Sequence, residues 1–482
     1  MGATATLKTD SRSYSLWSLS WPIFIELFLA TLLGTVDTLM VSRVSDDAVA
    51  VVGLSNQLFN GLNTLFMTIT GGAGILVAQK LGSRKPEEAR TIGIIAAKFT
   101  AGIGLCISAA LCLLPDQVAR LIQMPEELLP LARGYIAVAG CGLAPFALSA
   151  AFGTVIRNTG NTRGPMLTAV GINLLHVILN YGFIFGAFGF PKVGLQGVAI
   201  STFSCRTIMM LVLAYMFMHA FERKVGIADI RLRSPKLFKE VLRIGWPLGV
   251  NSSCWMLSQM VIFMFLAVMG AKELATRAYL NTLESFCFML GLAIAMGVQI
   301  KIAHLFGSKQ WKDAYASAYK ALGVGLVIVT VNAAALALTG RWFLGFFTKD
   351  PEILRMGVSL LALNIVLQPG KMLNMGFGSG LNAVGDTRFP MMTALFSMWG
   401  VATGLSYYFG LHLGWGLVAV YACMIADEYV RGALAFLRWR QRKHLTRAEQ
   451  RDLRQQSAAD GVAGQPAGAA AGANAAATGA RA

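Results

Sequence analysis

The stretch Gly160-Asn161-Thr162-Arg163-Gly164-Pro165-Met166 reappears 225 residues later as Gly385-Asp386-Thr387-Arg388-Phe389-Pro390-Met391. The same offset, with no net gap, carries residues 21–166 onto residues 246–391. Matches at so many Gly, Pro, Asn and Trp positions are too specific for shared composition to explain them. The chain therefore contains two copies of one fold, and duplicated membrane proteins are typically transporters with the substrate site between the halves.

Composition places this fold in a membrane. Hydrophobic residues make up 55% of the chain and charged residues only 13%, whereas soluble domains carry roughly 25% charged residues. Most apolar stretches exceed the roughly 20 residues that a helix needs to cross a hydrocarbon core about 30 Å thick. The alternating strands of a membrane barrel are absent. We predict an all-α polytopic membrane protein with twelve transmembrane helices, at about residues 14–42, 50–79, 91–115, 134–156, 164–188, 193–219, 244–269, 278–300, 321–340, 356–384, 390–411 and 413–437.

Each half holds six predicted helices, so both halves cross the membrane in the same direction. Parallel repeats are related by an axis along the membrane normal, and we expect a central cavity between them. The expected parts are a cytoplasmic tail (1–13), an N-terminal six-helix lobe (14–219), a cytoplasmic linker (220–243), a C-terminal six-helix lobe (244–437) and a basic, then Ala- and Gly-rich, disordered cytoplasmic tail (438–482).

The net charge of +17 reflects topology rather than a nucleic-acid partner. Lys and Arg concentrate in the segments that lie inside if the N-terminus is cytoplasmic, above all residues 80–90, 220–243 and 438–454. This positive-inside asymmetry predicts a multi-pass protein of the inner (cytoplasmic) membrane with both termini in the cytoplasm. The expected partners are the lipid bilayer and a small-molecule substrate, and we expect a monomer.

The seven cysteines all lie within predicted helices and show neither a CxxC pair nor a zinc-ligand spacing. We therefore predict unpaired thiols that pack as small apolar residues, and no metal site. They are Cys106, Cys112, Cys141, Cys205, Cys254, Cys287 and Cys423.

Asp37 is the strongest candidate for a coupling site, since an ionisable side chain inside a membrane is costly and is often functional. It lies six residues before Arg43, about 9 Å inside the outer end of the first helix. A carboxyl group shielded there could take up and release a proton. The alternative is an acid that reaches the interface or forms a structural pair.

In the fifth predicted helix, Asn173, His176 and Asn180 are spaced three and four residues apart and share one face. Asn180 lies in the outer half of that helix, at a depth similar to that of Asp37. A carboxylate that faces an amide and an imidazole could bind a proton or a cation. The alternative for His176 is a packing residue with a satisfied hydrogen bond.

The sequence resembles the multidrug and toxic compound extrusion (MATE) transporters of the multidrug/oligosaccharidyl-lipid/polysaccharide exporter superfamily. The resemblance covers about residues 14–440 and rests on the order and spacing of several motifs. They are Trp21-Pro22, Val36-Asp37-Thr38, the Gly-Ser turns at 82–83 and 307–308, Arg157-Asn158-Thr159-Gly160-Asn161-Thr162-Arg163 and the glycines of 186–197.

This resemblance implies a coupling aspartate at Asp37 and a hydroxyl contribution from Thr202 in the sixth helix. Similar proteins place an Asn, and then an Asn or Asp, at the positions of His176 and Asn180, so His176 is a departure. Some relatives carry a Glu where this chain has Trp255 and an Asp where it has Lys371. These differences disfavour a sodium site in the second half.

The candidates for the substrate cavity are Glu26, Asn173, Trp255, Glu284 and Lys371. Glu26 has no obvious partner in the sequence, and its repeat mate is Asn251. Lys371 could be a fixed cation that favours anionic or zwitterionic substrates, or it could pair with Glu284.

The sequence thus favours a secondary antiporter, coupled to protons or to sodium, that exports small organic, often cationic or amphipathic, compounds by alternating access. The alternative is a flippase or exporter of a lipid-linked or an anionic or zwitterionic metabolite. No P-loop signature is present, so an ion gradient is the expected source of energy. We expect no enzymatic activity and no cofactor beyond the coupling ion, since no catalytic spacing of His and acids occurs.

Overall fold

The computed structural model describes residues 14–226, 229, 231–232 and 234–441. The predicted tail at 1–13 and most of the predicted tail at 438–482 lie outside the described residues, whereas residues 438–440 belong to the last helix. Residues up to Leu437 form one compact unit, and a second unit begins at Arg438. Within the described residues all regular structure is helical, which confirms the predicted class.

The N-terminal lobe consists of the helices up to Met218. Its fourth membrane crossing is broken at Gly142, so that α5 and α6 replace the single predicted helix. The elements are α1 (Leu16–Val41), α2 (Asp46–Gly82), α3 (Pro86–Leu113), α4 (Pro115–Leu121), a 3₁₀ turn (Glu126–Leu128), α5 (Leu129–Cys141), α6 (Leu143–Asn158), α7 (Arg163–Phe185) and α8 (Leu195–Met218).

The C-terminal lobe repeats this order. Its elements are α9 (Pro235–Met269), α10 (Ala271–Gly307), α11 (Trp311–Phe347), α12 (Pro351–Ala383), α13 (Arg388–Ser397), two π-helical segments (Met398–Gly404 and Ser406–His412) and α14 (Gly416–Arg440). Ten described helices are long and apolar enough to cross a membrane. Together with α13 and its π-helical continuation, and with α14, they give the predicted six-plus-six layout.

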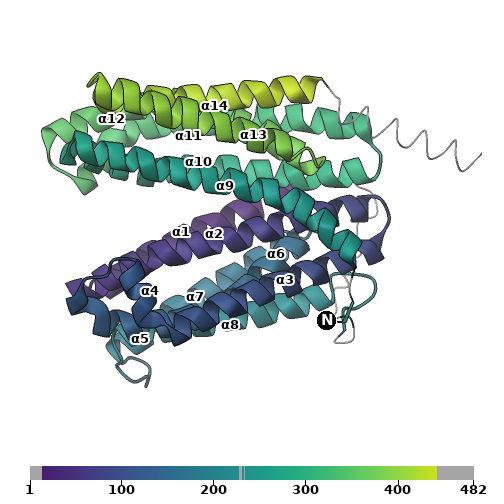
Figure 1. Cartoon of the computed structure of the whole chain (residues 1–482), viewed down its shortest axis with the longest axis horizontal. Coiled ribbons are helices and arrows are strands. Elements are labelled where there is room, and N and C mark those ends of the chain that lie inside the picture. The colour runs from purple at the N-terminus through teal and green to yellow at the C-terminus, as the bar shows by residue number, and fades with distance from the viewer. Residues whose placement is uncertain (1–13, 227–228, 230, 233, 442–482) are drawn as a thin grey trace, which may run out of the picture. The chain divides into compact units, whose positions relative to one another are not determined.

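The two lobes pack against each other through their first two helices. In Figure 1 the lobe of α1–α8 (purple to blue) lies below the lobe of α9–α14 (teal to yellow), and the ribbons converge at one end. Contacts join α1 to α10, α2 to α9 and α2 to α10. Trp21-Pro22 and its repeat thus lie on the helices that hold the halves together.

Reciprocal hydrogen bonds mark the end where the lobes meet. Gln79 donates from Nε2 to the backbone carbonyl of Ala383 over 2.6 Å. His304, the repeat mate of Gln79, has Nε2 2.8 Å from the carbonyl of Asn158, the repeat mate of Ala383. The pairing obeys the 225-residue offset, so the two-fold relation in the sequence is also present in the contacts.

The repeated Gly-Ser turns make this close approach possible. A Cβ atom on Gly82 would overlap the carbonyl oxygen of His304, and one on Gly307 would overlap the carbonyl oxygen of Gln79. Both positions therefore need glycine because a backbone from the other lobe occupies the place of a side chain. This explains why the glycine occurs in both halves of the sequence.

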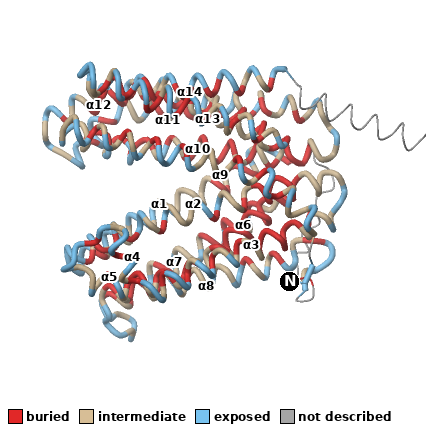
Figure 2. Tube along the Cα trace, viewed as in Figure 1, coloured by how far each residue is buried: buried red, intermediate tan, exposed pale blue. Residues whose placement is uncertain are grey.

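Burial changes along α2 as the lobes separate. Residues 72–78 are all buried, whereas Asn56, Gln57 and Asn60, nearer the start of the same helix, are exposed. In Figure 2 the buried positions continue from lobe to lobe near the right of the view. The lobes are thus packed at the end of α2 and α10 and leave polar side chains uncovered towards the other end.

One prediction about the cysteines is wrong. Cys112, in the last turn of α3, and Cys141, the last residue of α5, form a disulfide with their Cα atoms 6.0 Å apart. Ser108 on α3 donates hydrogen bonds to the carbonyls at the end of α5, so the packing of these helices brings together residues 29 positions apart. No sequence spacing signals such a pair. The remaining five cysteines are free.

Candidate functional site

Asp37 lies near the end of α1 away from the lobe contact. Val41, where the helix ends, is four positions later, which places Asp37 about 6 Å from that end. Its side chain is 22% exposed. α1 packs against α7, and this packing turns Asp37 towards the polar face of α7 that the sequence predicted.

Two of the three polar residues on that face contact Asp37. The amide Nδ2 of Asn180 donates to Asp37 Oδ1 over 2.7 Å. The Nδ1 atom of His176 lies 3.3 Å from the same oxygen. Asn173, one turn earlier, is half-buried and does not join this cluster. The structure thus brings together Asp37, His176 and Asn180, as their depth and spacing predict.

Two hydroxyl groups of α8 orient the amide and the imidazole. Ser201 donates to Asn180 Oδ1, and this fixes the amide so that its Nδ2 faces Asp37. Thr202 Oγ1 lies 3.3 Å from His176 Nε2 and donates to the carbonyl of Val198 over 2.8 Å. Sequence reasoning missed Ser201, although it directly precedes Thr202.

The contacts of His176 place one ring nitrogen at Thr202 and the other at Asp37. Thr202 Oγ1, beside Nε2, donates to Val198 and can accept from a hydrogen on Nε2. In that tautomer the lone pair of the buried Nδ1 faces Asp37 Oδ1, 3.3 Å away, and in the other tautomer Nδ1 carries the hydrogen and faces the carboxylate as a donor. In both cases a single proton between Nδ1 and Oδ1 joins the two groups.

Glu26, which had no partner in the sequence, forms an ion pair within the N-terminal lobe. Its Oε1 lies 2.8 Å from Nη1 of Arg157, and the Nη2 of Arg157 donates to Thr154 over 3.1 Å. The two side chains are 18% and 7% exposed. Arg157 lies on α6, so the pair ties α1 to α6 and is apart from the Asp37 cluster.

The second-half candidates do not form one cluster. Glu284 pairs with Arg277, whose Nη1 lies 3.1 Å away, and it accepts a hydrogen bond from Tyr421. The proposed pairing of Lys371 with Glu284 is therefore not observed. Lys371 instead lies over the ring of Phe288, with Nζ 5.8 Å from its centroid.

Trp255 is 48% exposed on α9. It forms no part of the charged groups above.

Comparison with known proteins assigns the chain to a family. The MatE family model matches residues 22–182 and 247–408, two segments whose starts are 225 residues apart. The chain belongs to the MatE family. It is a membrane transporter, and the cluster around Asp37 lies within the first of the two MatE segments.

Several MatE proteins align over nearly the full chain. The uncharacterized transporter YisQ of Bacillus subtilis is 35% identical over 441 residues, which cover 91% of this chain and 97% of YisQ. The multidrug resistance protein PmpM of Pseudomonas aeruginosa is 24% identical over 410 residues, covering 84% of this chain and 85% of PmpM.

Solved MATE structures share the fold. One, described as the outward-facing conformation of a multidrug resistance MATE family transporter, matches with a TM-score of 0.83 at 19% identity. A second, described as a MATE in the bent conformation, matches with a TM-score of 0.84 at 18% identity. Each match covers 93% of this chain and 99% of the other.

Proposed function

We propose that this protein is a proton-coupled antiporter that exports small organic compounds across the cytoplasmic membrane. The observation that carries the proposal is the 3.3 Å approach of the buried His176 Nδ1 to Asp37 Oδ1. The MatE relatives named as multidrug resistance proteins support the choice of substrate class.

The lobe contact supports an outward-open state of the transporter. The basic loops predict that α2 and α10 end on the cytoplasmic side, and those ends are where the lobes pack. The cavity would then open outward, with Asp37 near its mouth. A proton from outside would neutralise Asp37 and remove the charge that holds the Asn180 amide.

Loss of that charge would loosen α1 from α7 and change the packing of the N-terminal lobe. Substrate would leave the cavity while the proton is held. When the lobes reopen inward, the proton would pass to the cytoplasm and Asp37 would bind Asn180 again. A group that binds one proton per cycle in a shielded site couples the two fluxes.

The test measures ethidium transport in proteoliposomes with an imposed pH gradient, in the presence and absence of sodium. Wild type is compared with Asp37→Asn and with a matched control, Asp47→Asn, which makes the same change at an exposed position on α2. We expect transport that follows the pH gradient, is lost in Asp37→Asn and is kept in Asp47→Asn. Transport that needs sodium and ignores the pH gradient would contradict proton coupling.

A second candidate, an exporter of anionic or zwitterionic metabolites, is favoured by Lys371. Within the described residues it forms no ion pair with a carboxylate, and such a charge could bind an anionic group of a substrate. If wild type does not move ethidium, the same vesicles are tested with anionic and zwitterionic compounds. This candidate requires that Lys371→Gln abolishes their transport while Lys371→Arg retains it.

A further inference from the structure

A small pocket lies at the seam between the lobes, at the end where they pack together. It is formed by the start of α1, the end of α10 and the start of α11, and has a volume of about 230 Å³. Typical pockets for drug-sized ligands measure about 300–1,000 Å³, so this one suits a smaller group. It is far along α1 from Asp37 and takes no part in the proposed proton site.

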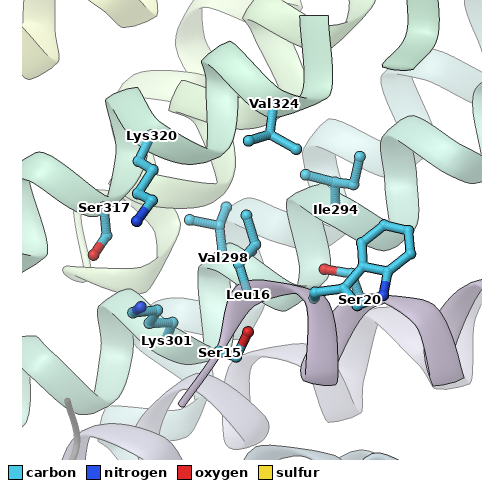
Figure 3. Close-up of a pocket in the computed structure, with 10 residues that line it drawn as sticks. Ser15, Leu16, Ser20, Ile294, Val298, Lys301, Ser317, Lys320 and Val324 are labelled. Atoms are coloured by element: carbon cyan, nitrogen blue, oxygen red, sulfur yellow. The ribbon is translucent and has the colours of Figure 1, made fainter. Parts of the chain in front are cut away.

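Two lysines give the pocket a positive charge. Lys301 reaches it from α10 and Lys320 from α11, and Figure 3 shows both side chains on the same side of the pocket, with Ser317 beside them. Neither lysine forms an ion pair with a carboxylate among the described residues. Asp313 interacts with Lys301 only as a nearby charge. Two amines with a single acidic neighbour favour an anion.

A buried hydroxyl without a partner lines the same pocket. Ser20 on α1 is 2% exposed, and its Oγ makes no hydrogen bond to any described residue. It lies against Gly297, where any Cβ would overlap that oxygen. Leaving a buried hydroxyl unpaired is unfavourable, so Ser20 is ready to donate to a ligand atom. Ser15 and Ser317 add two further hydroxyl groups.

A second, apolar groove lies further along the same two helices, α10 and α11. On α11 the pocket is lined by Ser317, Lys320 and Val324, and the groove by Val327 and Val331, onward to Thr339. These positions follow one another every three or four residues and thus form one face of the helix. From Val324 to Thr339 the face extends about 22 Å, longer than half of a bilayer core about 30 Å thick.

We propose that the pocket binds the phosphate headgroup of an anionic phospholipid of the cytoplasmic leaflet, with an acyl chain in the groove of α10 and α11. Basic pockets between transmembrane helices on this side are suited to such headgroups. The ligand would contact Ser20 in one lobe and Lys301 and Lys320 in the other. It would therefore stabilise the packed arrangement of the lobes described above.

The first experiment follows thermal unfolding and native mass spectra of the full chain in detergent. The protein is titrated separately with dioleoyl-phosphatidylglycerol and with three comparison ligands: dioleoyl-phosphatidylcholine, dioctanoyl-phosphatidylglycerol and inorganic phosphate. The test variant is Lys301→Gln/Lys320→Gln, and the matched control is Lys224→Gln/Lys312→Gln, which removes the same charge from exposed positions outside the pocket. We expect selective stabilisation by the long-chain anionic lipid.

In the test variant the phosphatidylglycerol affinity should fall roughly thirty-fold, from the loss of two basic groups near the membrane surface, while the control variant stays near wild type. Ser20→Ala, which keeps both lysines, should also weaken binding. Equal phosphatidylglycerol binding in test and control variants would overturn the site. If inorganic phosphate or the short-chain lipid stabilises the protein as much as the long-chain lipid does, the proposed acyl-chain groove is wrong. The pocket would then be a site for free phosphate.

Discussion

Neutralising one member of the Glu26–Arg157 ion pair is expected to destabilise the protein more than neutralising both. Breaking a buried pair by removing one partner typically costs about 3–5 kcal/mol, because the remaining charge is uncompensated. Here Glu26→Gln leaves an amide that still accepts from Arg157, and Arg157→Gln leaves a carboxylate that is 18% exposed. We therefore expect each single variant to lower the free energy of unfolding by about 2 kcal/mol.

The double variant, Glu26→Gln/Arg157→Gln, should lower the free energy of unfolding by only about 1 kcal/mol, because two glutamines bury no charge. The second half of the sequence carries neutral amides, Asn251 and Asn382, at the equivalent positions. The resulting coupling energy of about 3 kcal/mol lies at the upper end of the range for contacting residues. It would show that the pair acts as a unit that ties α1 to α6.

The assay is equilibrium unfolding of the purified protein in mixed micelles with increasing dodecyl sulfate, followed by tryptophan fluorescence. The control is Arg133→Gln, because Arg133 and Asp116 form an exposed pair 3.7 Å apart. We expect this substitution to lower the free energy of unfolding by less than about 1 kcal/mol. A double variant as unstable as the sum of the two single variants would refute the reasoning, since it would mean that the residues act independently.

Three further predictions concern the contacts between and beside the helices. Gly307→Ala should disfavour the packed lobes, because the new Cβ meets the carbonyl of Gln79, and cross-linking across the seam should fall. Glu284→Ala should lower stability by about 3 kcal/mol or more in the same unfolding assay, because it leaves a buried arginine unpaired. The hydrogen bond from Arg90 holds the pKa of Asp229 below its usual range. The ionised Asp229 carboxylate therefore stabilises the fold above about pH 3.9, the ordinary pKa of an aspartate, and this stabilisation is lost as pH falls through the lower folded-state pKa. The difference in unfolding free energy between wild type and Asp229→Asn should close on acidification.

The sequence is sufficient to predict the division into two lobes and the residues at the centre of the candidate site. The offset of 225 residues and the run of apolar spans determine the six-plus-six layout. Counting residues along single helices gives the similar depth of Asp37 and Asn180 and the shared face of His176 and Asn180. The contact of that face with Asp37 depends on the packing of α1 against α7, which the structure supplies.

Contacts that depend on packing between distant helices were not predictable. Arg157 meets Glu26 across 131 positions, and the sequence offers no rule that selects it from other basic residues. The disulfide between Cys112 and Cys141 has the same origin. Which hydroxyl faces His176 is likewise decided by the rotation of α8 against α7, and that rotation follows from side-chain packing.

The reciprocal hydrogen bonds of Gln79 and His304 have an evolutionary consequence. In a two-fold interface, residue i of one chain contacts residue j of the other, and j contacts i in return. Two separate six-helix chains would form this seam with the same contacts, so an ancestral half-length protein could have worked as a homodimer. Fusion into one chain then freed each copy to diverge. One half now has an acid, Asp37, and the other has Ile262 at the equivalent place.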